Sequence, residues 1–357
     1  MKAQIVLMAS IVPRIASFMI NNNSKQIAMK QMTQASSIRR IFSVAFSTST
    51  STDEFNSIFG GDYAGQSATF SILDGKVIPV PEHLVPESMV EWGQIPNCLE
   101  CIVSEDVLAL HADKAESDSE SILERNVVTV MPEVGCGLDN LDTMKTTNAI
   151  QAKQYNIFSV DDSFTIATTL IEDSKRRIEC IFTTHGEKKD EDEDVDLNVS
   201  RTRVCINLLD DNTLKSPIEI TKERKTSKTS TKGLIAKGGG LHASTIASLI
   251  GKENFKKPFC DAKAFDISEL EGAWRSVTEE SKTHERHGDF WNSYDGCTST
   301  ISLPGNVIVR NCKPEQSLEI CLLVSKDKES TSLERIGATY TLKNGANELD
   351  FIEEIKL

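Results

Sequence analysis

The first 52 residues of the chain contain no acidic residue. Six basic residues precede Asp53, namely Lys2, Arg14, Lys25, Lys30, Arg39 and Arg40. Ser, Thr, Asn, Gln and Ala fill most of the other positions. This composition is typical of a transit peptide, which is threaded unfolded through a translocon and then removed. We therefore expect residues 1–52 to be an organelle-targeting presequence, with an uncleaved basic tail as the alternative.

The leader also lacks an apolar run long enough to span a membrane. The apolar stretch at residues 4–12 follows Lys2 like the core of a signal peptide, but Pro13 ends it far short of the roughly 20 residues of a spanning helix. A two-part leader suits a plastid surrounded by extra membranes, and Phe18 resembles the phenylalanine of such leaders. The expected location is the plastid (chloroplast) stroma. Residues 40–43 would also suit a mitochondrial cleavage site, so the mitochondrion stays the alternative.

Clusters of basic residues are missing from the rest of the chain. The leader holds six of the 39 Lys and Arg residues, which leaves 33 against 53 acidic residues and a net charge of −20. Nucleic acids and anionic membranes are bound by clustered Lys and Arg, so such an acidic body predicts neither as a partner. No later segment has the length and apolarity of a transmembrane helix. We expect a soluble mature protein of two domains.

Recognisable catalytic motifs are absent as well. The chain has no GxSxG, HExxH or kinase motif, and Gly238–Gly240 fits neither phosphate-loop pattern, so that loop is predicted to be a flexible joint. We predict no catalytic residue, which favours a protein that is not an enzyme. Among the nine cysteines, Cys98 and Cys101 form a CxxC that could indicate redox chemistry or half of a zinc site. Ordinary reduced thiols are the favoured interpretation.

Short runs of alternating apolar and polar residues are what the body does contain. These runs predict strands near residues 164–170, 178–183, 203–208, 307–309, 318–324, 336–342 and 349–353. Turn residues such as Pro304, Gly305 and Asn306 separate them, which favours antiparallel hairpins. The predicted fold class is mainly β, with two consecutive antiparallel lipocalin-like (calycin) barrels and one short linking helix near residues 241–254. The predicted domains are residues 53–221 and 263–357, joined by a linker at 222–262.

Both predicted barrels open with a glycine followed two residues later by an aromatic residue. Gly61 precedes Tyr63, and Gly272 precedes Trp274. Lipocalin-like barrels begin in this way: the glycine relieves crowding where the chain enters, and the aromatic ring fills the closed end. An eight-stranded barrel can hold a small apolar ligand or be filled by its own side chains. Both remain open for the first barrel, and the filled state is favoured for the second.

The segment between Val80 and Trp92 combines two prolines with Trp92 and carboxylates at Glu87 and Glu91. It cannot pair as a central strand, and it could form a helical turn that packs over an open barrel end. The candidate ligand-binding residues are therefore Tyr63, Phe70, Glu87, Glu91, Trp92 and Trp274. His83, Glu87 and Glu91 would share a face of one helix, but Pro86 argues against such a helix, and no metal site is predicted.

Four stretches together resemble a known family. They are residues 60–70, 80–92 and 131–136, and a tail with Arg335, Tyr340, Gly345, Leu349, Phe351, Glu354 and Lys356. They are similar to an uncharacterised two-barrel, calycin-like family of cyanobacteria and plastid-bearing eukaryotes, over about residues 55–357. Related calycins carry tetrapyrroles or lipids, or attach bilin chromophores to proteins. The resemblance implies two barrels but no particular activity.

Three functions follow as hypotheses. The first is a soluble organellar protein that binds a small apolar or amphipathic ligand, a tetrapyrrole or a lipid, in a β-barrel. The second is a chromophore-attachment (bilin lyase-like) factor or enzyme, in which Glu87 or Glu91 handles protons. The third is an assembly or interaction protein with filled barrels and an unknown protein partner. The sequence names no cofactor beyond a possible tetrapyrrole or lipid.

Overall fold

The computed structural model describes the chain from residue 60 to residue 357, with gaps. The described ranges are 60–85, 87–109, 121–130, 144–161, 164–172, 176–185, 199–208, 214–225, 258–277, 283–292, 298–313, 315–325, 333–341 and 348–357. The predicted presequence, the predicted helix near 241–254 and the family-like stretch at 131–136 lie outside these ranges. Within them the protein is mainly β, as the alternating pattern predicted, and all strand pairs are antiparallel.

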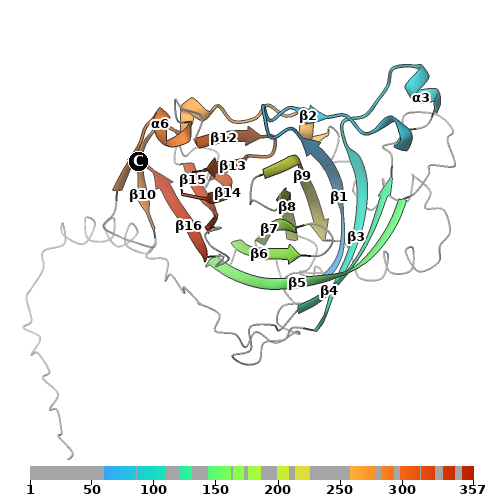
Figure 1. Cartoon of the computed structure of the whole chain (residues 1–357), viewed down its shortest axis with the longest axis horizontal. Helices are drawn as coiled ribbons and strands as arrows, with labels where there is room; N and C mark the ends of the chain where they lie inside the picture. The colour runs from blue at the N-terminus through green and yellow to red at the C-terminus, as the bar shows by residue number, and fades with distance from the viewer. Residues whose placement is uncertain are drawn as a thin grey trace, which may run out of the picture. The chain divides into compact units, whose positions relative to one another are not determined.

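The first sheet has nine strands. They are β1 (Gly61–Phe70), β2 (Val77–Ile78), β3 (Leu99–Ala109), β4 (Ser121–Val130), β5 (Met144–Asp161), β6 (Phe164–Glu172), β7 (Arg176–His185), β8 (Val199–Leu208) and β9 (Leu214–Lys225). From β3 to β9 each strand pairs with the next along the chain, and β1 pairs with both β3 and β9 (Figure 1). The pairing from Tyr63 opposite Lys225 to Phe70 opposite Ile218 closes β1 and β3–β9 into a ring. We call these eight strands the first ring.

The second sheet has seven strands. They are β10 (Gly272–Ser276), β11 (Thr283–Arg286), β12 (Thr298–Leu303), β13 (Val307–Cys312), β14 (Ser317–Ser325), β15 (Leu333–Thr341) and β16 (Glu348–Lys356). Their order is β11-β10-β16-β15-β14-β13-β12, so β10, like β1, pairs with the last strand of its own half. In the described part of the chain, β11 and β12 are the edges of this sheet and do not pair with each other. The described residues thus form two antiparallel sheets, one closed and one open, and the predicted second barrel is not confirmed.

Short helices occupy the ends of the strands. They are η1 (Glu82–Leu84), α3 (Glu87–Glu91), η3 (Phe259–Asp261), η4 (Ile267–Leu270) and α6 (Gly288–Trp291). Helix α3 ends at a glycine in the left-handed region: the N–H of Gly93 (φ 68°) donates to Val90 O and that of Gln94 donates to Met89 O. This paired arrangement satisfies the last carbonyls of the helix and explains why the sequence has glycine there. No helix among the described residues has the length and apolarity needed to cross a membrane.

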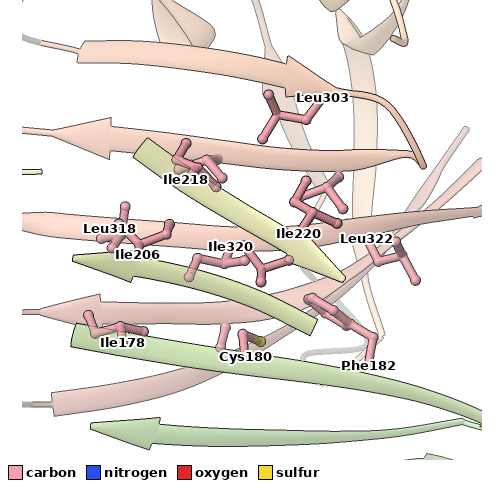
Figure 2. Close-up of a cluster of buried hydrophobic side chains, with 14 of the residues drawn as sticks. Ile178, Cys180, Phe182, Ile206, Ile218, Ile220, Leu303, Leu318, Ile320 and Leu322 are labelled. Atoms are coloured by element: carbon pink, nitrogen blue, oxygen red, sulfur yellow. The ribbon is translucent and has the colours of Figure 1, made fainter. Parts of the chain in front are cut away.

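One apolar core joins the two sheets. Strands β7, β8 and β9 contribute alternate residues such as Ile178, Ile206 and Ile220, and strands β12 and β14 contribute Leu303 and Ile320. Figure 2 shows these side chains meeting between strands of the first and second sheets. Alternation in a strand sends neighbouring side chains to opposite faces. Each sheet therefore has one face in this shared core and a second face with a different composition.

Strand β9 continues past the predicted domain boundary at residue 221. Lys222 to Lys225 belong to the strand and pair with β1 and β8. A basic composition indicated a linker here, but alternation continues through Glu223. Of these residues, Glu223 and Lys225 are buried on the second face of the strand, where Glu223 pairs with arginines, whereas Lys222 is half-buried and Arg224 is exposed on the other face.

Candidate functional site

The inner face of the first ring is the face opposite the shared core. A closed ring has one inner and one outer face, and here the outer face packs against the second sheet. In each strand, the side chains that alternate with those of the shared core therefore point into the ring. Strand β8 shows this plainly: Val204 and Ile206 lie in the shared core, whereas Arg201 and Arg203 are buried on the inner face. The sequence thus places two guanidinium groups inside the ring.

Two carboxylates inside the ring meet both arginines. Arg201 Nη1 lies 2.8 Å from Glu105 Oε2, and Arg201 Nε donates to Glu223. Arg203 Nη2 lies 3.1 Å from Glu105 Oε2 and 3.3 Å from Glu223 Oε1. The Arg201 guanidinium carbon lies 3.4 Å from the centre of the Tyr63 ring. We call Tyr63, Glu105, Arg201, Arg203 and Glu223 the Tyr63 cluster; it combines two cations and two anions with one aromatic ring.

Burial governs the electrostatics of the Tyr63 cluster. Desolvation alone would lower the pKa of Arg201, but Glu223 and Glu105 outweigh it and raise that pKa above its usual value. Burial is also the main reason why the pKa of the Tyr63 hydroxyl is raised. Both effects keep the guanidinium charged and the phenol neutral. The Arg201 guanidinium therefore keeps its positive charge beside the two carboxylates, and the Tyr63 phenol stays neutral beneath it.

The second sheet carries a similar cluster on the face opposite the shared core. Arg335 Nη1 lies 3.1 Å from Glu319 Oε2, and Arg335 Nη2 lies 2.7 Å from Glu354 Oε2. Arg310 pairs with Glu319 at 2.9 Å, and Arg286 pairs with Glu354 at 2.5 Å.

Three aromatic rings complete this second cluster. The Arg335 guanidinium carbon lies 5.9 Å from the Trp274 ring and 5.3 Å from the Trp291 ring. Those of Arg286 and Arg310 lie 3.8 and 4.0 Å from the Phe290 ring. Buried Trp274 also donates from Nε1 to Leu270 O at 2.7 Å. The Trp274 cluster consists of Trp274, Arg286, Phe290, Trp291, Arg310, Glu319, Arg335 and Glu354.

Strand register shows that the two clusters are built in the same way. Arg201 is opposite Glu223 across β8 and β9, and Arg335 is opposite Glu354 across β15 and β16. The aromatic residues also match, because both are opposite a lysine of the last strand: Tyr63 faces Lys225 and Trp274 faces Lys356.

The glycines that open the two halves match as well. Gly61 has a φ of 125° and Gly272 a φ of 123°, values that L side chains rarely adopt. The Gly-x-aromatic spacing in the sequence indicated this similarity at the start of each half. The paired arginine and glutamate come from the last two strands of each half, far along the chain from the glycine. The similarity between the halves therefore includes their ends as well as their beginnings.

Exposure of the inner face changes along the first ring. At one end Tyr63, Arg201 and Glu223 are buried. Further along the same three strands, inner-face residues become half-buried or exposed: Ser67, Thr69, Cys205, Asn207 and Glu219. We call these five residues the mouth.

Outer-face neighbours of the mouth stay buried, including Phe70, Ile206 and Ile218. The exposure is therefore specific to the inner face and does not reflect loose strand ends. In the mouth, Ser67 Oγ donates to Glu219 Oε1 at 3.1 Å. Solvent reaches the inner face of the ring at the end opposite the Tyr63 cluster.

The inner wall between the Tyr63 cluster and the mouth is chemically mixed. Along β6, buried Thr165 and Thr169 alternate with buried Ala167 and Ile171. Neighbouring strands add buried Glu179, Ile181 and Thr183 of β7, Thr221 of β9, and Cys101 and Val103 of β3. A surface with hydroxyl groups and methyl groups side by side suits a molecule that has both polar and apolar parts.

The six residues predicted to bind a ligand fall into three places. Tyr63 and Trp274 are buried beneath arginines in the two clusters. Phe70 lies on the outer face, in the shared core, with its ring centre 6.3 Å from that of Phe259. Glu87, Glu91 and Trp92 are exposed at α3, and Trp92 has 68% of its surface accessible. The structure thus does not bring the six together.

The segment at α3 packs on the first ring through another side chain. Met89 is buried with Val80 and Val85, and the group contacts Leu99, the first residue of β3. Leu99 is opposite Ser67 of the mouth. The expected helical turn is present and borders the accessible end of the ring, but Met89 rather than Trp92 makes the contact.

The metal and CxxC hypotheses each meet a geometric obstacle. His83 lies in η1, which ends at Leu84, whereas Glu87 and Glu91 lie in α3, so one helix does not carry all three. Cys98 lies in the shared core, whereas Cys101 lies on the inner face with Tyr63. In the part of the chain that the structure describes, no group of three His, Cys, Asp or Glu residues could hold a metal ion.

Arginines of the Tyr63 cluster were not predicted from the sequence. Arg201 and Arg203 occupy alternate positions of a strand that also carries the apolar residues Val204, Ile206 and Leu208, and such charges must be paired if both faces are buried. That pattern is the signal that could have revealed them. Arg335, Glu354 and Lys356 did appear in the family-like tail, and the structure brings Arg335 and Glu354 together beside Trp274.

The fold and the two clusters define a class: an antiparallel β protein in which a closed ring and an open sheet repeat one glycine–aromatic–arginine arrangement. Comparison with known protein families and with curated proteins finds no match for this chain.

Proposed function

We propose that the first ring binds a small amphipathic ligand that enters at the mouth. The observation that carries this proposal is the change in exposure along the inner face, from the buried Tyr63 cluster to the accessible mouth. The mixed wall of threonines and aliphatic side chains favours an amphipathic molecule over a purely apolar one. A tetrapyrrole or a lipid, the ligand classes suggested by the calycin resemblance, has this character.

The two matched clusters support the calycin-like assignment. In both halves an arginine lies over the aromatic residue of the Gly-x-aromatic motif, at the same strand register, as expected for two domains of one architecture.

We propose that the protein is located in the plastid stroma, because of the composition of its leader, with the mitochondrion as the alternative. A fluorescent protein fused to residues 1–52 tests this location, and a signal that stays in the cytosol would exclude both organelles.

Ligand capture tests the proposed function directly. The purified protein is incubated with an extract of plastid pigments and lipids and repurified, and the retained small molecules are identified by mass spectrometry. We expect a stoichiometric amphipathic molecule. Cys205→Phe, which fills the mouth, should reduce retention at least about tenfold, the size of a lost contact worth about 1.4 kcal/mol. Trp92→Ala is the matched control and should change retention less than about twofold.

The outcomes separate the three hypotheses. A molecule retained equally by wild type and Cys205→Phe would place binding outside the ring and contradict the proposal. A retained bilin that is transferred to a cysteine of an acceptor protein would instead support the attachment factor, with Glu87 and Glu91 as residues to mutate. Absence of any retained molecule, together with a co-purifying protein, would support the filled assembly protein.

The second sheet is proposed to serve as a packed support. Trp274 and Trp291 have no accessible surface, and Arg335 is 1% exposed. Inner-face residues Thr339 and Thr341 of β15 are half-buried, as in the mouth. The difference is that three aromatic rings occupy the inner face of the second sheet, which favours the filled state there.

A further inference from the structure

Two cysteines that lie 162 positions apart in the sequence meet beside the first ring. Cys98 immediately precedes β3, whose first residue, Leu99, is opposite Ser67 of β1. Helix η3 contains Cys260 and lies against β1: the Phe259 N–H donates to Gln66 Oε1 at 3.2 Å. The chain therefore brings Cys260 to the start of β3 through contacts that do not involve sulfur.

The two thiols are direct neighbours in the shared core. A side-chain hydrogen bond joins Cys98 and Cys260, and both residues belong to the same apolar cluster. Cys98 is 1% exposed and Cys260 is 6% exposed. Cys101, the other cysteine of the CxxC, is buried on the opposite face of β3. The residue that can react with Cys98 is therefore Cys260 and not its neighbour in the motif.

The contact makes the two thiols chemically unequal. The hydrogen bond from Cys98 lowers the pKa of Cys260, because it stabilises the Cys260 thiolate. The same bond, followed by burial, raises the pKa of Cys98. The thiolate is the nucleophile in disulfide exchange, and Cys260 is also the more exposed of the two residues. Cys260 is therefore the attacking sulfur and Cys98 the resolving one.

We propose that Cys98 and Cys260 form a thiol–disulfide site that links the first ring covalently to the start of the second half of the chain. The oxidant is a small disulfide of the glutathione class. The Cys260 thiolate attacks one sulfur of this disulfide and breaks its S–S bond, and the departing thiolate takes up a proton. Cys98 then loses its proton and attacks Cys260 Sγ, which releases the second small thiol. Two protein thiols and one disulfide thus become one protein disulfide and two small thiols.

Peptide mapping of the full chain tests this site without any mutation. The reduced protein is equilibrated with oxidised and reduced glutathione, acid-quenched, alkylated and digested without reduction. We expect a cross-linked peptide pair containing Cys98 and Cys260, and the loss of two of the nine titratable thiols. Dithiothreitol should restore both thiols. Alkylation of Cys98 and Cys260 to the same extent in oxidising and reducing buffers, or a cross-link between Cys98 and Cys101, would overturn the proposal.

Single variants assign the two roles. Cys98→Ser should leave Cys260 as a stable mixed disulfide with glutathione, whereas Cys260→Ser should leave Cys98 unmodified. Cys101→Ser is the matched control from the same motif and should keep the cross-link. Cys98→Ala and Cys260→Ala replace the serine variants if a buried hydroxyl prevents folding. Glutathione found on Cys98 in the Cys260 variants would contradict the assigned order of attack. The site does not depend on ligand binding, so the two proposals fail separately.

Discussion

The first ring and the second sheet both bury an aromatic residue beneath an arginine, but the numbers of charged groups around that arginine differ. Each covers the aromatic residue of its first strand with an arginine that is held by two glutamates. Among the described residues, the Tyr63 cluster has two guanidinium groups and two carboxylates, whereas the Trp274 cluster has three guanidinium groups and two carboxylates. The ring closes on itself and the sheet does not.

The comparison shows that the closure of a sheet into a ring and the filling of its inner face have different structural causes. The glycine–aromatic–arginine arrangement is present in both halves, so it does not by itself produce a closed ring. Closure of the ring comes from the eight-residue pairing of β1 with β9, which leaves none of its eight strands as an edge. The two clusters differ in their aromatic content: the Tyr63 cluster contains one aromatic ring, and the Trp274 cluster contains two tryptophans and a phenylalanine.

Removal of the arginine that lies over the aromatic residue, Arg201 or Arg335, should give the largest loss of stability, and the size of the loss should differ between the halves. Arg201→Met leaves one guanidinium for two buried carboxylates, and we expect a loss of about 3–5 kcal/mol in the free energy of unfolding. Arg335→Met leaves two guanidinium groups for two carboxylates. Because that remaining set is balanced, we expect a smaller loss, roughly 2–3 kcal/mol, that comes mainly from lost hydrogen bonds and packing.

Urea denaturation measures both losses. Lys76→Ala removes an exposed ion pair with Asp74 and is the control, with an expected change below about 1 kcal/mol. An Arg335→Met loss equal to or larger than that of Arg201→Met would show that charge balance does not distinguish the clusters.

Alanine at the glycines that open the two halves should give an intermediate effect of the same size in both. Gly61 and Gly272 have nearly identical φ values, and an added Cβ would meet Lys225 Cε at 3.2 Å and Lys356 Cε at 3.5 Å, respectively. We expect Gly61→Ala and Gly272→Ala each to cost about 1–3 kcal/mol because the backbone must stay at positive φ. Thermal unfolding of each variant checks this. A cost in only one half would break the structural equivalence of the two glycines.

The sequence located seven of the strands but not the residues that they bring into contact. Period-two alternation located β6, β7, β8 and β13–β16, because each strand has one face in the shared core. It could not show that Arg201 meets Glu105, since these residues come from strands far apart in the chain and only ring closure joins them. The two Gly-x-aromatic motifs were visible because Gly61 and Tyr63, like Gly272 and Trp274, are local.

Sequence spacing did not show which side chains pack at two places. Trp92, a candidate ligand-binding residue, follows α3 and is exposed, whereas Met89 packs against the first ring. The CxxC at Cys98 and Cys101 suggested a local pair, but an offset of three in an extended segment places the two side chains on opposite faces. Proximity along the chain therefore hid the contact of Cys98 with Cys260, which depends on the position of η3.

The smallest expected effect is a dependence of stability on pH that belongs to the first ring. His185 ends β7, and its pKa is lowered by partial burial and, less strongly, by Lys225. Near pH 6.5 the His185 imidazole therefore takes up a proton in the unfolded chain, whereas in the folded protein it stays neutral until the pH is lower. The contribution of His185 to stability is therefore fully present above about pH 6.5 and decreases as the pH falls below it.

His185→Gln tests this dependence. We expect the variant to lose less stability than wild type between pH 7 and pH 5.5, as measured by thermal unfolding. The carboxylate of Glu354 has a lowered pKa because Arg335 and Arg286 outweigh its burial, so its effect appears only at more acidic pH and does not overlap this window. Equal slopes for wild type and variant would exclude His185 as the source. If the dependence of stability on pH in this window is lost in His185→Gln, it originates in the first ring. The two halves, although built alike around their arginines, would then respond differently to acid.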